Sequence, residues 1–191
     1  MNIGRFTQRS IQAVQDLEKT AYAYGNQEIE QEHLIYTLYH QEDSLIRKLL
    51  EKMEIQPQAF EESLDAALEA RVKVSGGSLH YGQYLNKALV EAEDEATQMG
   101  DEYVSVEHLF LSLIRHASPS VKKLFQEYGI TKERFLKALS TVRGNQRVVS
   151  DNPEATYDTL NKYGQDLVER ARDQKLDPVI GRDAEIRNIV R

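Results

Sequence analysis

Residues 25–38 read GNQEIEQEHLIYTL, and residues 100–113, which lie 75 positions later, read GDEYVSVEHLFLSL. The two segments share a glycine, the tripeptide Glu-His-Leu and a further leucine at identical spacing. The correspondence continues without a gap in both directions, at Ala13/Ala88, Ala21/Ala96, Lys48/Lys123, Leu49/Leu124, Ile55/Ile130, Phe60/Phe135 and Leu64/Leu139. An ungapped duplication predicts two copies of one structural unit, packed as a pseudo-twofold pair. The seam between two such copies is a natural groove for a ligand.

Apolar residues recur at spacings of three and four along both copies, which is typical of amphipathic α-helices. The pattern predicts four helices in each copy and therefore an all-α fold of eight helices. Thr7, Ser105 and Thr131 fit N-caps, because their hydroxyls can accept a hydrogen bond from a first-turn N–H. Gly25 and Gly100 fit helix C-termini, where a left-handed backbone is needed.

The domain organisation follows from the same pattern. Repeat one spans about residues 6–71 and repeat two about residues 81–143, within a predicted repeat domain of residues 1–144. Polar residues with glycine and proline indicate a linker over residues 145–153. Helical periodicity returns over about residues 154–174, and a further helical stretch over residues 184–191 reaches the last residue, so we expect residues 154–191 to be the truncated start of a further domain.

Composition excludes several classes of function. The net charge is −7, without a basic face of the kind that phosphate contacts require, so nucleic-acid binding is not expected. The chain has no cysteine, which excludes disulfides and thiol nucleophiles. It lacks both an N-terminal apolar run and a stretch of about 20 apolar residues, so we expect a soluble cytoplasmic protein with no membrane segment.

The repeated Glu-His-Leu is the most conspicuous candidate for chemistry. A metalloprotease helix carries two histidines four residues apart with a glutamate between them. Here His40 follows His33 by seven positions and His116 follows His108 by eight, so neither pair has that spacing. Because a catalytic residue is seldom needed twice, we expect both Glu-His-Leu histidines to pack against or cap their helices. No Gly-Lys dipeptide exists for a phosphate-binding loop, so we expect no enzymatic activity from this chain.

The starts of the two equivalent first helices suggest a binding surface. Phe6, Thr7, Tyr81 and Tyr84 lie at or near them. If the repeats bring these helix starts together, apolar groups and free N–H donors converge and form a patch for extended, apolar polypeptide. The alternative is that these aromatic side chains simply complete the core.

These residues resemble a known family. The doubled unit, with GRFT at residues 4–7 and Glu-His-Leu in each half, resembles the Clp N-terminal repeat domain. The tail, with NKYGQDL at 161–167 and KLDPVIGRD at 175–183, resembles the start of the first AAA+ ATPase domain of the Clp heat-shock family. NPEATY at 152–157 favours the ClpB disaggregase branch over the ClpC and ClpA unfoldases. The resemblance covers the whole chain.

The resemblance implies a function for the parent protein. The parent would be a homohexameric ring ATPase that uses ATP and magnesium, threads aggregated polypeptide through its pore and works with the DnaK chaperone system. The N-terminal domain, a monomer without a cofactor of its own, would bind unfolded or aggregated polypeptide and pass it to the pore from a loose linker. The alternatives are a regulatory cap that binds no client and an adaptor-docking domain of an unfoldase.

The resemblance also implies site residues. The substrate-binding positions carried over from the family are Thr7, Asp101 and Glu107. The residues expected to line the groove are Phe6, Tyr81 and Leu85. Val179 and Ile180 match the segment that flanks the adenine of the parent's first nucleotide site. That site is incomplete here, because the phosphate-binding loop would lie beyond Arg191.

Overall fold

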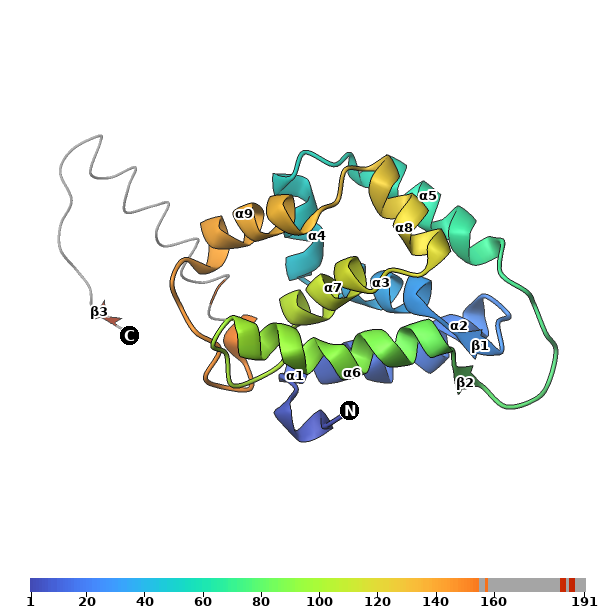
Figure 1. Cartoon of the computed structure of the whole chain (residues 1–191), viewed down its shortest axis with the longest axis horizontal. Helices are drawn as coiled ribbons and strands as arrows, with labels where there is room; N and C mark the ends of the chain where they lie inside the picture. Colours follow the sequence, from blue (N-terminus) through green and yellow to red (C-terminus); the bar gives the residue numbers. More distant parts are fainter. Residues whose placement is uncertain (155–156, 158–182, 185, 188–191) are drawn as a thin grey trace. The chain divides into compact units, whose positions relative to one another are not determined.

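The structure is a computed structural model that describes residues 1–154, 157, 183–184 and 186–187 (Figure 1). After a 3-10 turn at Ile3–Arg5, repeat one contributes α1 (Gln8–Gln15), α2 (Leu17–Ala23), β1 (Glu28–Ile29), α3 (Gln31–Tyr39), α4 (Leu45–Lys52) and α5 (Pro57–Glu69). Repeat two contributes β2 (His80–Tyr81), α6 (Gln83–Gln98), α7 (Val106–Arg115), α8 (Pro119–Glu127) and α9 (Lys132–Arg143). The predicted all-α fold is confirmed.

The chain divides into two compact units, residues 1–156 and 157–191. In the second unit, β3 (Asp183–Ala184) pairs antiparallel with β4 (Ile186–Arg187). None of the helices in the described part of the chain is long and apolar enough to cross a lipid bilayer.

The predicted helix ends agree with the structure. Thr7 caps α1 and Thr131 caps α9 by accepting a backbone N–H in the first turn. Gly25 and Gly100 have φ of 72° and 74°, the left-handed backbone expected after a helix. One prediction differs in detail, because the first helix of repeat one is divided at Asp16 into α1 and α2. Backbone hydrogen bonds continue across the division, so α2 follows directly from α1.

Two short parallel pairings, absent from the sequence prediction, join the repeats. Phe6 pairs with Val104 at one seam, and Ile29 pairs with Tyr81 at the other. Phe6 and Tyr81 are 75 positions apart, and so are Ile29 and Val104, so the two pairings are equivalent by the duplication. Each repeat therefore places the segment before its first helix against the segment before the second long helix of the other repeat. We call these the Phe6 seam and the Tyr81 seam.

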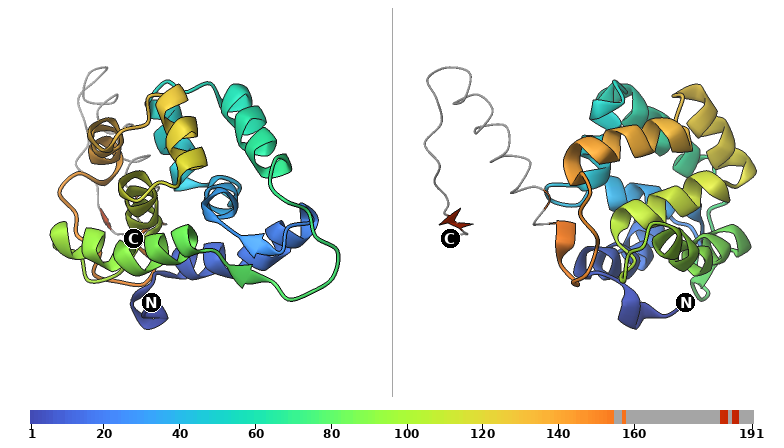
Figure 2. Two further views of the ribbon diagram at one scale, coloured as in Figure 1. Left: turned by 45° about the vertical axis from the view of Figure 1, so that its right-hand side comes forward. Right: turned by 60° about the vertical axis from the view of Figure 1, so that its left-hand side comes forward.

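The helices of the two repeats interleave (Figures 1 and 2). α4 packs against α9 and α5 against α8, while α1 contacts α7 and α3 contacts α6. Phe60 of α5 meets the ring of Tyr128 with centroids 5.4 Å apart, and Phe110 of α7 stacks on Phe135 of α9 at 5.0 Å. These side chains form one core that both repeats share. Burying each such apolar side chain stabilises the fold by about 1.5–3 kcal/mol.

The segment after α9, residues 145–154, contacts the repeats. The Val148 side chain is fully buried, and its carbonyl accepts a hydrogen bond from Glu102 N–H at 2.8 Å. The Asp151 carbonyl accepts one from Gln8 N–H at 2.7 Å. The expectation of a loose linker is therefore wrong for this part of the segment, because its backbone completes hydrogen bonds that the repeats leave open. The domain boundary at residue 144 stays a prediction.

Candidate functional site

The two Glu-His-Leu histidines are buried capping residues, as predicted. Nδ1 of His33 accepts a hydrogen bond from Glu30 N–H at 2.9 Å, and Nδ1 of His108 accepts one from Ser105 N–H at 2.8 Å. Each ring thereby satisfies an N–H at the start of its own helix, in a capping box with histidine in the third helical position. Because Nδ1 accepts, Nε2 carries the proton and donates.

The group facing Nε2 differs between the repeats. His33 Nε2 faces Asn26 Oδ1 at 2.9 Å, whereas His108 Nε2 faces the Asp101 carboxylate at 2.7 Å. Burial, helped by the charge of Arg71, lowers the pKa of His33 to about 4. His33 is therefore neutral in the folded protein at neutral pH.

A pH effect on stability follows from His33. In the unfolded chain the pKa of this imidazole is about 6.5, so unfolding takes up a proton between about pH 6.5 and 4. The free energy of unfolding is therefore expected to decrease as the pH falls from about 6.5 to 4. Urea titrations at pH 7.0, 5.5 and 4.5 measure this decrease in the native chain and in His33→Gln. The variant serves as the reference because it has no titratable group at position 33. Equal pH slopes for the two proteins would refute the assignment.

A buried ion cluster forms behind the second Glu-His-Leu. Arg143 of α9 donates to Glu107 Oε2 at 3.2 Å and also to the Asp101 carboxylate, and all three side chains are at most 2% exposed. Asp101 in addition accepts hydrogen bonds from His108 Nε2 and from Val148 N–H. Burial alone would raise the pKa of Asp101, but these donors outweigh it and lower the pKa to about 2. Asp101 is therefore a fixed negative charge.

A third carboxyl group, that of Glu154, completes the Phe6 seam. Its Oε2 accepts hydrogen bonds from the Thr7 hydroxyl at 2.8 Å and from Val106 N–H, the first N–H of α7, at 3.1 Å. Glu154 is buried, and this burial, together with the neighbouring charge of Glu107, raises its pKa to about 7. The same carboxyl group therefore contacts the N-terminal ends of two helices from different repeats.

The Tyr81 seam has a comparable carboxylate from within the fold. Glu30 accepts hydrogen bonds from the N–H groups of Tyr84 and Leu85, at 3.1 and 2.9 Å, and from Gln31 N–H at 3.0 Å. Burial raises the pKa of Glu30, and the three N–H donors oppose that shift. In the duplication Glu30 corresponds to Ser105 and Gly82 corresponds to Thr7. The helix N-terminal N–H groups at the two seams are therefore capped by residues at different positions of the repeat.

The structure brings some of the predicted substrate-binding residues together and separates others. Thr7, Asp101 and Glu107 belong to the buried group around Glu154 and Arg143. The Leu85 side chain is buried near the Tyr81 seam, and Phe6 is buried at the Phe6 seam. Tyr81 is 36% exposed. The expected patch of free N–H donors is not present at the seams, because Glu30 and Glu154 occupy those donors. Val179 and Ile180 lie outside the described residues.

Sequence reasoning did not identify Glu30, Arg143 or Glu154. Glu30 was assigned only a favourable charge near a helix start. Arg143 lies at the end of the predicted second repeat, and Glu154 lies just after the predicted linker of residues 145–153. Nothing in the spacing of the chain relates residue 154 to residue 7, which is 147 positions away. Val148, an apolar residue in a polar stretch, was the available signal that this segment docks.

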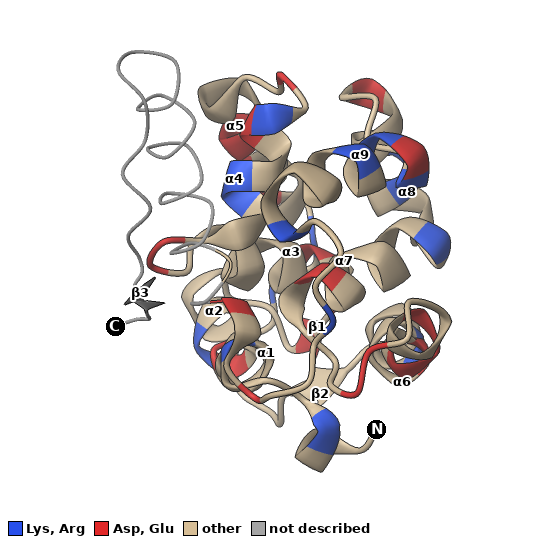
Figure 3. Ribbon diagram, turned by 90° about the vertical axis from the view of Figure 1, so that its left-hand side faces the viewer, with Lys and Arg blue, Asp and Glu red and all other residues tan. Residues whose placement is uncertain are grey.

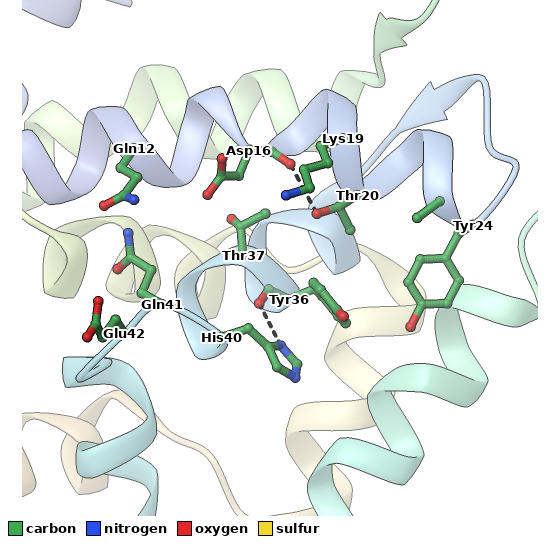
Figure 4. Close-up of a pocket in the computed structure, with 11 residues that line it drawn as sticks. Gln12, Asp16, Lys19, Thr20, Tyr24, Tyr36, Thr37, His40, Gln41 and Glu42 are labelled. Atoms are coloured by element: carbon green, nitrogen blue, oxygen red, sulfur yellow. Dashed lines mark hydrogen bonds between the residues drawn. The ribbon is translucent and has the colours of Figure 1, made fainter.

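An open cleft lies in repeat one between α1–α2 and the end of α3 (Figure 4). It has a volume of about 320 Å³ and is lined by Gln12, Asp16, Lys19, Thr20, Ala23, Tyr24, Tyr36, Thr37, His40, Gln41 and Glu42. The Tyr36 ring stacks on His40 with centroids 4.0 Å apart and meets Tyr24 edge-on at 5.7 Å. The cleft thus offers aromatic faces beside hydrogen-bonding groups, a combination suited to a peptide segment.

The equivalent place in repeat two carries an ion pair. Arg115, which corresponds to His40, forms an ion pair with Glu95, which corresponds to Thr20, at 2.5 Å. The duplication is therefore asymmetric at the surface, and the described cleft belongs to repeat one.

Charged side chains of both signs are distributed over several elements of the described residues. In Figure 3, acidic residues lie along α6 and near β1, whereas Lys and Arg lie on α4, α8 and α9 among other residues. Among the residues that the structure describes, no group of three or more His, Cys, Asp or Glu side chains is arranged to hold a metal ion.

Comparison with known proteins identifies relatives. Residues 5–128 match the Clp repeat (R) N-terminal domain family. The chaperone protein ClpB of Nitratidesulfovibrio vulgaris is 47% identical over 197 residues, which cover 100% of this chain and 23% of that protein. The present chain therefore spans about a quarter of that relative's length.

Solved structures share the fold. The Hsp104 N-terminal domain from Candida albicans has a TM-score of 0.67 at 20% identity, covering 76% of this chain and 96% of that one. The ClpV N-domain in complex with a VipB peptide has a TM-score of 0.56 at 18% identity, covering 72% and 86%.

Proposed function

The chain belongs to the Clp repeat N-terminal domain family, and we propose that it is the client-binding N-terminal module of an ATP-dependent protein disaggregase. The observation that carries this proposal is the similarity to a ClpB chaperone along the entire chain. The parent would be a cytoplasmic homohexameric ring that uses ATP and magnesium and cooperates with the DnaK system. The module would engage unfolded or aggregated polypeptide and transfer it to the pore.

The surface of repeat one supports capture of polypeptide. The cleft rimmed by Tyr24, Tyr36 and His40 provides aromatic faces for apolar side chains and polar groups for a backbone. Tyr81, which belongs to β2 of repeat two and is 36% exposed, would be a further aromatic contact. The buried residues Thr7, Asp101 and Glu107 would act indirectly, by holding the two repeats in the geometry that presents this surface.

Weak binding suits a module that passes its client on. A tightly held segment would resist transfer, and attachment to the ring already raises the local client concentration. We therefore expect dissociation constants in the micromolar range or weaker, about −8 kcal/mol or less favourable. Nanomolar binding of an unfolded polypeptide would contradict the transfer role.

Fluorescence anisotropy of a labelled, permanently unfolded protein, titrated with the chain, tests the proposal. Tyr36→Ser is expected to weaken binding at least threefold, because it removes the ring shared by both aromatic contacts of the cleft. His40→Ala tests the exposed rim with less effect on the core. Tyr22→Ser is the matched control, since Tyr22 is 81% exposed and does not line the cleft.

The outcomes separate the proposed function from its alternatives. Saturable binding that Tyr36→Ser and His40→Ala weaken, with helicity unchanged, supports client capture in the cleft. No binding at high concentration favours a regulatory cap. Adaptor docking is the other alternative, favoured by the ClpV N-domain complex with a peptide. Tight binding of one defined peptide, with no binding of unfolded protein, would favour it.

A further inference from the structure

The two seams differ in where their carboxyl group comes from. At the Tyr81 seam, Glu30 precedes α3 and is part of the repeat itself. At the Phe6 seam the corresponding position is Ser105, whose short side chain is engaged with His108 of the same helix. The carboxyl group that reaches both Thr7 and Val106 N–H belongs to Glu154, which lies beyond α9. One seam is therefore complete within the repeats, while the other depends on the segment that leaves them.

The segment 145–154 contacts the repeats at several points between α9 and Glu154. Val148 donates its N–H to Asp101 Oδ1 at 2.9 Å and is fully buried, and Asp151 accepts from Gln8 N–H, the first N–H of α1. Glu154 comes last along this path and makes the contacts with both repeats. The segment thus satisfies helix N-terminal donors of α1 and α7 that would otherwise need water.

From this geometry we propose that Glu154 is a latch, whose carboxyl group fastens the connecting segment 145–154 into the Phe6 seam and whose release frees that segment from the repeats. A fastened segment restricts the directions in which the chain leaves the repeat domain, whereas a released segment acts as a longer tether. The inference stands independently of whether the chain binds clients.

The charges around Glu154 give the latch a direction of response to pH. Glu107 on α7 repels an ionised Glu154, and Arg143 on α9 is already engaged by Glu107 and by Asp101 of the preceding loop. His108 on α7 is turned toward Asp101, and Thr7 on α1 carries no charge. Oε1 of Glu154 and Oε1 of Glu107 are both buried without a hydrogen-bond partner among the described residues.

The docked segment therefore favours the protonated form of Glu154, whose pKa is raised to about 7, above its ordinary value of about 4.3 when undocked. Docking is strongest below about pH 4.3 and weakens as the pH rises through that interval, by up to tenfold for each pH unit. Above about pH 7 no further change is expected.

Amide hydrogen exchange of the full chain, read residue by residue and corrected for intrinsic rates, tests the latch. The reporters are Val106 N–H, bonded to Glu154, and Gln8 N–H, bonded to Asp151. Their protection factors are expected to fall at least tenfold from pH 5.5 to 7.5. In Glu154→Gln, which mimics the uncharged carboxyl group, protection should stay high at both pH values. In Glu154→Ala it should be at least tenfold lower at both.

The Tyr81 seam supplies the internal control. Tyr84 and Leu85 N–H are capped by Glu30, so their protection should be the same in all three proteins. Loss of protection at Tyr84 and Leu85 in Glu154→Ala would report unfolding of the whole domain. In that case the pH dependence of Val106 and Gln8 protection in Glu154→Gln, compared with the native chain, tests the latch. Parallel pH profiles in those two proteins, or unchanged Val106 and Gln8 protection in a folded Glu154→Ala, would overturn the latch.

Discussion

Replacing Arg143 with alanine is expected to lower the free energy of unfolding by about 3–5 kcal/mol. Arg143 is the cation shared by Asp101 and Glu107, and the three side chains are at most 2% exposed. Removing it leaves two carboxylates in an apolar interior without their counter-charge, and the cost is the unpaired burial more than the lost attraction. Urea unfolding followed by circular dichroism at 222 nm measures the change.

A matched arginine provides the control. Arg47 also pairs with a glutamate, Glu51, but the two side chains are 52% and 47% exposed. Arg47→Ala is expected to cost less than about 0.5 kcal/mol, because exposed pairs one helical turn apart contribute little. Adding Glu107→Gln to Arg143→Ala should recover part of the loss by removing a buried charge. Equal losses for Arg143→Ala and Arg47→Ala would rule out the buried cluster.

Gly82→Ala is expected to destabilise the protein by about 2–4 kcal/mol, the sum of overpacking and a lost helix cap. A Cβ at position 82 would lie 1.9 Å from Glu30 Oε2, so the carboxylate would have to move away from the N–H groups of Tyr84 and Leu85. Glycine is required here for space, since its backbone is extended (φ −72°) and any residue adopts it.

Differential scanning calorimetry can compare Gly82→Ala with Gly4→Ala. Gly4 is exposed, and a Cβ there would meet only the Asn2 side chain at 3.3 Å, so little change is expected. Glu30→Ser in the Gly82→Ala background should cost less than it does in the native chain, because the carboxylate has already been displaced. An unaltered transition temperature in Gly82→Ala would show that Glu30 does not cap α6 as described.

Much of the local structure was predictable because it depends on residues close together in the chain. The 75-residue repeat and its three- and four-residue apolar spacing correctly predicted the helices. The hydroxyl of Thr7 and the positive φ of Gly25 were predictable because a cap or a turn involves only neighbouring residues. The role of His33 as a buried cap followed from its recurrence as His108.

The candidate site was harder to predict. Phe6 and Leu85 were expected to line a groove, but each lies under a seam whose pairing joins residues about 50 to 100 positions apart. Periodicity shows which face of a helix is apolar, but it does not show which other element packs against that face. The cleft beside Tyr36 is lined by Thr20 and His40, where repeat two has the ion pair of Glu95 and Arg115.

The sequence by itself determined the duplication, the helices, the caps at Thr7 and Thr131 and the Clp family, since each rests on short-range spacing or on matched residues. Only the tertiary structure decided that Glu154 occupies the Phe6 seam, that Arg143 neutralises Asp101 and Glu107, and that the connecting segment is docked. The physical reason is that a buried charge or an open N–H must find a partner wherever the fold brings one near, and sequence separation does not limit that choice.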